Sequence, residues 1–235
     1  MLRRLDKKQP LNFKFSAKNL AWAKKQILNY PKGRKQSAVI PLLFRAQEQE
    51  GWVSKPAIEV VAKMLDMAPV RVFEVASFYF MFHLSPVGSV AHIQVCGTTP
   101  CMLRGSDGLI RQCKDKISKR PMEIAHDGKI SWEEVECLGA CSNAPLVQIG
   151  SDYYEDLDEE SFAKIVTDLI SGRKPVPGSQ TRRFSSEPIE NLTTLGTKVE
   201  EAQNASVELF IDSSIKEKGS KTKRSLVNKK DAPNA

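Results

Sequence analysis

Four cysteines of this chain form two closely spaced pairs. The first pair has the spacing C-x4-C, the second has the spacing C-x3-C, and 35 residues separate the two pairs. They are Cys96, Cys101, Cys137 and Cys141. Four cysteines that come together hold an iron–sulfur cluster or a structural zinc ion, or they form two disulfides. The function of the chain depends on which of these three applies.

Both cysteine pairs fall on turns that follow predicted strands. Residues 90–95 have the β-branched pattern of a half-buried strand that delivers Cys96 at its end. Residues 97–100 interrupt that pattern, and a helical apolar periodicity begins near Cys101. We therefore expect Cys101 near a helix N-terminus, where unpaired backbone N–H groups favour a thiolate. In the second pair, Gly139 allows a tight loop whose N–H groups can point at sulfur.

The spacing of the pairs favours a [2Fe–2S] cluster, with zinc and disulfides as alternatives. Structural zinc sites usually carry C-x2-C knuckles, which are tighter than the spacings found here. The N-terminus shows no uninterrupted apolar segment of a secretory signal, and paired thiols in a reducing compartment more often hold metal or do redox work. The fifth cysteine, Cys113, falls on the apolar face of the helix expected after Cys101 and is interpreted as a small core residue.

Five longer motifs carry a family resemblance. They are YPKGRKQSAVIPLL at 30–43, QEGWV at 49–53, FYFMF at 78–82, VCGTTPCMLRGS at 95–106 and EVECLGACSNAP at 134–145. Together they resemble the thioredoxin-like [2Fe–2S] ferredoxin subunits of the NADH-dehydrogenase module of respiratory complex I. The resemblance runs from about Phe15 to about Leu195, and Ser77 and Phe80 depart from it, because Thr is expected at both positions.

The resemblance implies a ligand set and a role. Cys96 and Cys101 would hold one iron of a single [2Fe–2S] cluster, and the second cysteine pair, Cys137 and Cys141, would hold the other iron. Candidate contacts to the cluster sulfurs are Gly97, Thr98, Gly139 and Ala140. FMN and NADH would bind only on a partner subunit. The implied partners are that flavin- and NADH-binding subunit and a neighbouring iron–sulfur subunit of complex I, and the chain would transfer electrons without being catalytic alone.

Two other functions are open. One is the equivalent subunit of an NAD-linked hydrogenase or formate dehydrogenase, and the other is a structural zinc module that scaffolds a complex. The sequence has no Walker loop, no Gly-x-Gly-x-x-Gly and no Gly-x-Ser-x-Gly motif, so catalysis or nucleotide binding by the chain itself is not indicated. His83, His92 and His126 are scattered in the sequence, and a lone histidine in a strand, such as His92, is interpreted as structural.

The sequence predicts an α+β fold in three regions. An N-terminal helical bundle over 1–86 is followed by a thioredoxin-like [2Fe–2S] domain over 87–172 and by a linker with a mostly disordered tail over 173–235. The tail is short of aromatic residues and rich in Ser, Thr, Lys and Glu, which argues against a packed core. Its Lys-rich stretch, 216–230, is interpreted as a solvated segment.

Capping residues and apolar periodicity place the helices of the first region. Ser16, Ser37 and Ser54 are predicted to cap the first three helices, Gly51 is predicted to end the second, and a fourth is expected over 69–76.

The second region is predicted to alternate strands with helices. After the first strand and its helix, extended segments are expected at 122–124, 130–132, 145–149 and 153–154. Asp158 is predicted to cap a final helix.

The charge of the chain points to protein partners. It contains 35 Lys and Arg against 28 Asp and Glu, with the basic excess concentrated before Glu48. No basic patch is interleaved with aromatic residues, so nucleic acid is not an expected partner. No apolar run approaches the roughly twenty residues of a transmembrane helix, so membrane contact is expected only indirectly through the complex. We expect a cytoplasmic location, peripheral on the cytoplasmic face of a bacterial inner membrane, with the mitochondrial matrix as the alternative.

Overall fold

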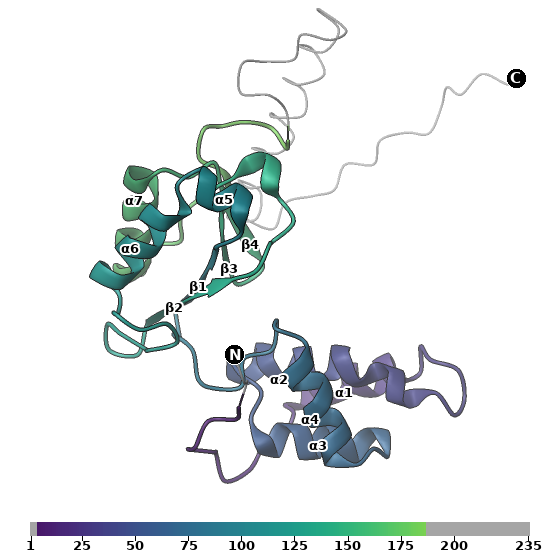
Figure 1. Cartoon of the computed structure of the whole chain (residues 1–235). Helices are drawn as coiled ribbons and strands as arrows, with labels where there is room; N and C mark the ends of the chain where they lie inside the picture. The colour runs from purple at the N-terminus through teal and green to yellow at the C-terminus, as the bar shows by residue number, and fades with distance from the viewer. Residues whose placement is uncertain (1–3, 187–235) are drawn as a thin grey trace, which may run out of the picture. The chain divides into compact units, whose positions relative to one another are not determined.

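The computed structural model describes residues 4–186 (Figure 1). Residues up to Gln180 form one compact unit, in which four helices come first and a sheet with further helices follows. This order confirms the predicted α+β class. The greater part of the predicted tail, including the Lys-rich stretch 216–230, lies outside the described residues.

Four α-helices and one short 3-10 helix make up the first part of the chain. They are α1 Ala17–Ile27, the 3-10 helix Lys35–Ala38, α2 Val39–Glu50, α3 Lys55–Leu65 and α4 Pro69–Phe78. The Ser16 hydroxyl accepts a hydrogen bond from the Asn19 N–H, and the Ser54 hydroxyl accepts one from the Ala57 N–H, as predicted for N-caps. Gly51 ends α2 in the left-handed conformation, with φ +80°, as predicted.

The predicted capping role of Ser37 is wrong. Ser37 lies inside the 3-10 helix, and α2 begins at Val39 after Ala38, which provides no side-chain cap. The Val39 N–H bonds to the Gln36 carbonyl instead. Because the preceding 3-10 turn already supplies carbonyl acceptors, the start of α2 does not require a hydroxyl at its N-terminus.

The helices share a hydrophobic cluster. Among its fully buried side chains are Leu42 and Leu43 from α2 and Leu65 from α3. Burial of a leucine side chain contributes about 1.5–3 kcal/mol, so these contacts dominate the packing of the helices. Phe82 and Leu84, from the segment after α4, belong to the same cluster. The helical core therefore fixes the chain on both sides of residue 83.

A five-stranded mixed sheet forms the second part of the chain. Its strands are β1 Ala91–Cys96, β2 Ile130–Val135, β3 Val147–Ile149, β4 Asp152–Glu155 and β5 Gly178–Ser179. The strand order is β2-β1-β3-β4-β5, with parallel pairing of β1 with β2 and of β4 with β5. The pairings of β1 with β3 and of β3 with β4 are antiparallel.

The extended segment predicted at 122–124 does not form a strand. Only an isolated bridge between Ala125 and Ile130 joins this segment to the sheet. Met122 has φ +64°, which takes its backbone out of the extended region.

Three helices accompany the sheet. They are α5 Thr99–Leu103, α6 Ser106–Lys116 and α7 Glu159–Ile170. The single helix expected after Cys101 is divided at Gly105, whose φ of +104° is incompatible with a continuous right-handed helix. α6 and α7 contact each other and lie side by side in Figure 1. Asp158 caps α7 as predicted, accepting a hydrogen bond from the Ser161 N–H at 2.7 Å.

The sheet, α6 and α7 share a second hydrophobic cluster, which contains Ile93, Trp132 and Phe162. It is separate from the helical cluster, which supports the predicted boundary at 86–87, although the three-domain division stays a prediction. Within residues 4–186, no helix is long and apolar enough to cross a membrane.

Candidate metal centre

The two cysteine loops leave neighbouring strands at the same edge of the sheet. β1 ends at Cys96, and β2 ends at Val135, which faces Cys96 in the parallel register. The Gly97 N–H donates to the Val135 carbonyl at 3.0 Å, so the pairing continues one residue past the strand. Cys137 follows two residues after Val135. Because the carboxyl ends of parallel strands share one edge, the pairing brings together loops that are distant in sequence.

Sulfur contacts are short within each loop. Cys137 Sγ lies 3.5 Å from Cys141 Sγ and accepts a hydrogen bond from the Gly139 N–H at 3.4 Å. In the first loop, the Thr98 hydroxyl lies 3.4 Å from Cys96 Sγ. A disulfide requires sulfurs about 2.05 Å apart, and all five cysteines are free. The second pair is therefore close without being bonded.

The loops also interact with each other. The Gly139 N–H, the Cys141 thiol and, more weakly, the Thr98 hydroxyl lower the pKa of Cys137. Contact with Cys137 raises the pKa of Cys141, and the charge of Cys96 in the other loop adds to this effect. The four sulfurs thus share one electrostatic environment, as ligands of a common centre must.

The two thiols of the first loop differ in their ionisation. Burial raises the pKa of Cys101 to about 12, and its contact with Cys96 adds to the effect. Burial also raises the pKa of Cys96, but hydrogen bonds from Thr98 and from the Leu138 backbone outweigh it, so the pKa of Cys96 is lowered. Metal ligation requires deprotonated thiols, so a bound cation would have to displace the proton of Cys101.

The surroundings of the loops differ in exposure. Cys96 and Cys101 are fully buried and pack against Ala144 and Leu146, whereas the second pair is exposed. The Tyr153 hydroxyl donates to the Leu138 carbonyl at 2.8 Å and thereby ties the second loop to β4.

The structure places the four predicted contact residues in different ways. Thr98 and Gly139 each contact a cysteine sulfur. The Gly97 N–H is directed to β2, and the Ala140 carbonyl accepts from the Asn143 N–H at 3.0 Å. For all four residues, contact with cluster sulfurs stays a prediction.

Two backbone contacts to sulfur were not anticipated from the sequence. Hydrogen bonding by the Leu138 backbone lowers the pKa of Cys96, and bonding by the Leu146 backbone lowers that of Cys101, although burial raises both values. A backbone N–H is present at almost every residue, so side-chain type does not indicate which one faces a sulfur.

The interpretation of the histidines as scattered is wrong for two of them. The rings of His83 and His92 lie 4.7 Å apart between centroids. His83 follows α4 and His92 is in β1, so only the tertiary structure brings them together.

The donor set fits an iron–sulfur cluster. Cysteine thiolates are the usual ligands of a [2Fe–2S] cluster, which takes two for each iron. Here each loop offers one pair, the sulfurs interact across the loops, and donors from Thr98 and Gly139 are directed at sulfur. These contacts resemble the outer hydrogen bonds that orient and tune metal ligands.

Comparison with known families places the chain. The thioredoxin-like [2Fe-2S] ferredoxin family matches residues 23–170, and the chain belongs to this family. Family membership implies a [2Fe–2S] cluster, in preference to zinc or two disulfides.

The relatives refine the class. The chain is 56% identical over 192 residues to an NADH-quinone oxidoreductase component of Rhizobium meliloti (strain 1021), the first form of its E subunit, covering 81% of this chain and 70% of that protein. It is 54% identical over 159 residues to the E subunit of the NADH-quinone oxidoreductase of Rickettsia bellii (strain RML369-C), covering 67% and 95%. These relatives confirm the predicted family and the predicted role as an electron-transfer subunit of NADH-quinone oxidoreductase.

A solved structure supports the fold. A chain of the NAD+-reducing [NiFe]-hydrogenase in the H2-reduced state matches with a TM-score of 0.51 at 16% identity. The match covers 59% of this chain and 23% of that chain. At this identity the match shows a shared fold and does not assign the chain to a hydrogenase.

Proposed function

We propose that the chain carries one [2Fe–2S] cluster on Cys96, Cys101, Cys137 and Cys141 and transfers single electrons within an NADH-quinone oxidoreductase. The observation that supports this most strongly is the meeting of two cysteine loops at the carboxyl edge of the β1–β2 pair. Four convergent thiols with hydrogen-bond donors on their sulfurs are suited to hold a cluster and to no bond-breaking chemistry of their own.

The chain's residues would tune electron transfer rather than react. When bound, a [2Fe–2S] cluster accepts and releases one electron at a time. Donors to sulfur, such as the Thr98 hydroxyl and the Gly139 N–H, stabilise negative charge and so favour the reduced state. Burial of Cys96 and Cys101 excludes water from one side of the site, and the exposed second loop leaves the other side open to a partner.

The proposed electron donor is the FMN of a partner subunit that oxidises NADH, and a neighbouring iron–sulfur subunit completes the surroundings. Exposed apolar side chains at the end of α4, including Phe78 and Phe80, support a protein-binding surface. We place the assembly at the cytoplasmic face of a bacterial inner membrane, which the chain would reach through its partners.

Cysteine substitutions test the ligand set. Cys96→Ser and Cys141→Ser should each abolish the [2Fe–2S] EPR signal of the reduced protein, since each removes one ligand. Cys113→Ser is the matched control, because Cys113 is buried in the separate core between the sheet and α6 and should leave the signal intact. An unchanged spectrum in either ligand variant would contradict the assignment of that cysteine.

Partner identification tests the assembly. Purification of the tagged chain in mild detergent should recover flavin-binding and iron–sulfur subunits of an NADH-quinone oxidoreductase. Recovery of a hydrogenase large subunit instead would overturn the proposed assembly while leaving the cluster in place. Metal analysis of anaerobically purified protein should find iron and labile sulfide, and about one zinc with neither of these would overturn the cluster.

A further inference from the structure

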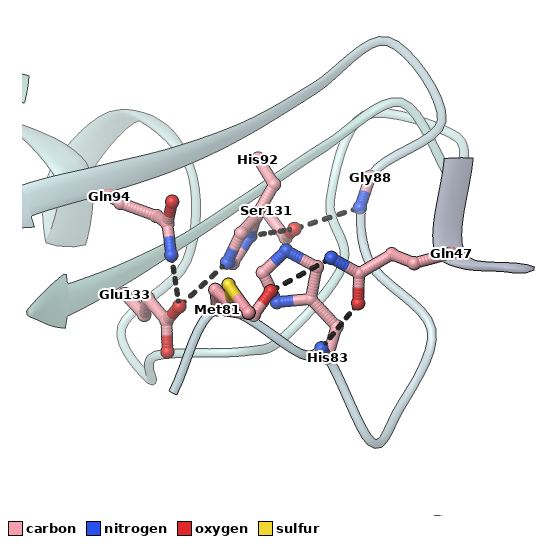
Figure 2. A network of polar contacts seen from close by, with 8 residues as sticks. All are labelled: Gln47, Met81, His83, Gly88, His92, Gln94, Ser131 and Glu133. Atoms are coloured by element: carbon pink, nitrogen blue, oxygen red, sulfur yellow. Dashed lines mark hydrogen bonds and ion pairs between the residues drawn. The ribbon is translucent and has the colours of Figure 1, made fainter. Parts of the chain in front are cut away.

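A second group of metal-ligating side chains lies away from the cysteine loops. It consists of His83, His92 and Glu133, whose ligand atoms all lie within 4.8 Å of one another. His83 comes from the segment after α4, His92 from β1 and Glu133 from β2 (Figure 2). Two imidazoles and a carboxylate are a common ligand set for zinc.

Two of the three ligand groups already stand at close range. His92 Nε2 lies 3.1 Å from Glu133 Oε1, and the side chains are 6% and 23% exposed. The ring of His83 meets that of His92 edge to face, with an interplanar angle of 77°. Ligands of a zinc ion bound at about 2.1 Å lie at most about 4.2 Å apart, so the three groups need only a small inward movement.

Outer hydrogen bonds orient the two strand residues. His92 Nδ1 lies 2.8 Å from the Ser131 hydroxyl, which also accepts from the Gly88 N–H at 2.8 Å. Gln94 donates to Glu133 Oε1 at 2.9 Å. Metal-binding histidines commonly use the second ring nitrogen in this way, and such partners affect metal affinity by about 10- to 100-fold.

The backbone of His83 is fixed by the helices. The Gln47 side chain of α2 accepts from the His83 N–H at 2.7 Å and donates to the Met81 carbonyl at 2.8 Å (Figure 2). The His83 carbonyl accepts from the Val53 N–H at 2.8 Å. The helical region therefore presents His83 to the edge of the sheet in a defined position.

We propose that His83, His92 and Glu133 bind a divalent transition-metal ion of the zinc type. Binding requires an unprotonated His92 Nε2, with the ring proton on Nδ1, where the Ser131 hydroxyl can accept it. Three protein ligands leave a fourth position, which water fills. The ion would join the segment after α4 to β1 and β2, and so act as a clip near the start of the ferredoxin-like region.

The site is independent of the iron–sulfur centre and of the proposed function. None of its ligands is a cysteine, and His92 and Glu133 each lie four residues before a cysteine of their own strand or loop. Zinc binding here can therefore fail without affecting the EPR signal that tests the cluster ligands.

Zinc titration of the full chain with its iron–sulfur cluster assembled tests the proposal. We expect about one Zn²⁺ per chain by equilibrium dialysis with metal analysis, at unchanged iron content. X-ray absorption at the zinc edge should show only N and O neighbours near about 2.0–2.1 Å, and no sulfur near about 2.3 Å.

Substitutions locate the ion. His83→Ala and Glu133→Gln should each weaken Zn²⁺ binding more than about tenfold, the smallest effect expected even from an outer partner. Glu133→Gln keeps the size of the side chain, so it also serves if His83→Ala disturbs folding. His126→Ala is the matched control, since His126 is exposed and bonds to the Lys116 carbonyl outside the cluster.

Three results would overturn the proposal. They are no Zn²⁺ bound by the wild-type chain, a zinc shell that contains sulfur, and equal affinity in wild type and in both ligand variants.

Discussion

The two cysteine loops do the same chemistry in opposite surroundings. The first loop turns directly from the central strand β1 into α5, so Cys96 and Cys101 are enclosed by the core. The second loop follows β2, the edge strand, and Cys137 and Cys141 stay exposed. The position of a loop's strand within the sheet therefore decides how much solvent reaches its sulfurs.

This difference affects how each loop holds its thiols. In the first loop burial opposes charge, and the pKa of Cys101 rises to about 12. In the second loop the Gly139 N–H, from within the loop itself, lowers the pKa of Cys137. The buried half of the site depends on its surroundings, whereas the exposed half depends mainly on its own backbone.

The largest expected effect is a difference in thiol reactivity. In the cluster-free protein at about pH 8, Cys137 should react with an alkylating reagent about two orders of magnitude faster than Cys101, because Cys101 has little thiolate and its higher nucleophilicity compensates only partly. Timed alkylation followed by peptide mass spectrometry measures both rates. Equal rates would show that the two loops do not differ in this way.

Glycine substitution tests the dependence of the second loop on its own backbone. Gly139→Ala should destabilise the protein by about 1–2 kcal/mol and lower its iron occupancy, because Gly139 has φ +84°, which a residue with Cβ adopts at a cost. Urea denaturation and iron analysis measure the two effects.

The first loop supplies the control for this substitution. Gly97→Ala introduces a Cβ 2.1 Å from the Glu134 carboxylate, the far end of a flexible side chain that can turn away. Its cost should be smaller than that of Gly139→Ala. The reverse order would contradict the role assigned to the backbone of the second loop.

Removal of a helix cap tests the anchor of the second loop. Asp156 and Leu157 donate backbone hydrogen bonds to the Asn143 and Pro145 carbonyls, just after the loop, and Asp158 then caps α7. Asp158→Ala should cost about 1 kcal/mol in urea denaturation. Ser16→Ala, which removes the cap of α1, should cost a similar amount without affecting the loop.

The stability lost in Asp158→Ala should depend on pH. Hydrogen bonds from Ser161 lower the pKa of Asp158 below its usual 3.8. The charged cap therefore stabilises the fold fully above pH 3.8, and its contribution is lost as the pH falls through the lowered pKa. Denaturation of wild type and variant across this range should show the difference shrinking only below pH 3.8. A difference that is constant down to the lowest pH would contradict the lowered pKa.

The smallest effect concerns Thr98, which touches both loops. Thr98→Val keeps the side-chain shape and removes a hydrogen bond worth about 0.5 kcal/mol, which corresponds to a reduction potential about 20 mV more negative. Thr99→Val is the control, since Thr99 is exposed at the start of α5, and it should leave the potential unchanged. A redox titration followed by EPR measures both. A potential that rises in Thr98→Val would contradict donation of the hydroxyl to sulfur.

Local patterns predicted most of the elements. Ser16, Ser54 and Asp158 cap helices as expected, because the capping interaction joins residues only three positions apart. Ser37 failed because a 3-10 helix already leads into α2. The segment at 122–124 failed because Met122 takes a positive φ, which its residue type does not indicate.

The site shows the same division. The four cysteines and the donors Thr98 and Gly139 could be identified from the sequence, since they lie within a few residues of one another in each loop. The Leu138 and Leu146 backbone contacts and the meeting of His83 with His92 could not, because they join segments that only folding brings together.

By itself, the sequence determined the thiol donors, their grouping in two loops and the family, because these reside in residue types and short spacings. Only the tertiary structure decided that Cys96 stands opposite Val135, which pair of sulfurs is buried and which histidines meet. The physical reason is that strand register, burial and electrostatic coupling depend on contacts between residues far apart in the chain, whose partners are set when the core packs.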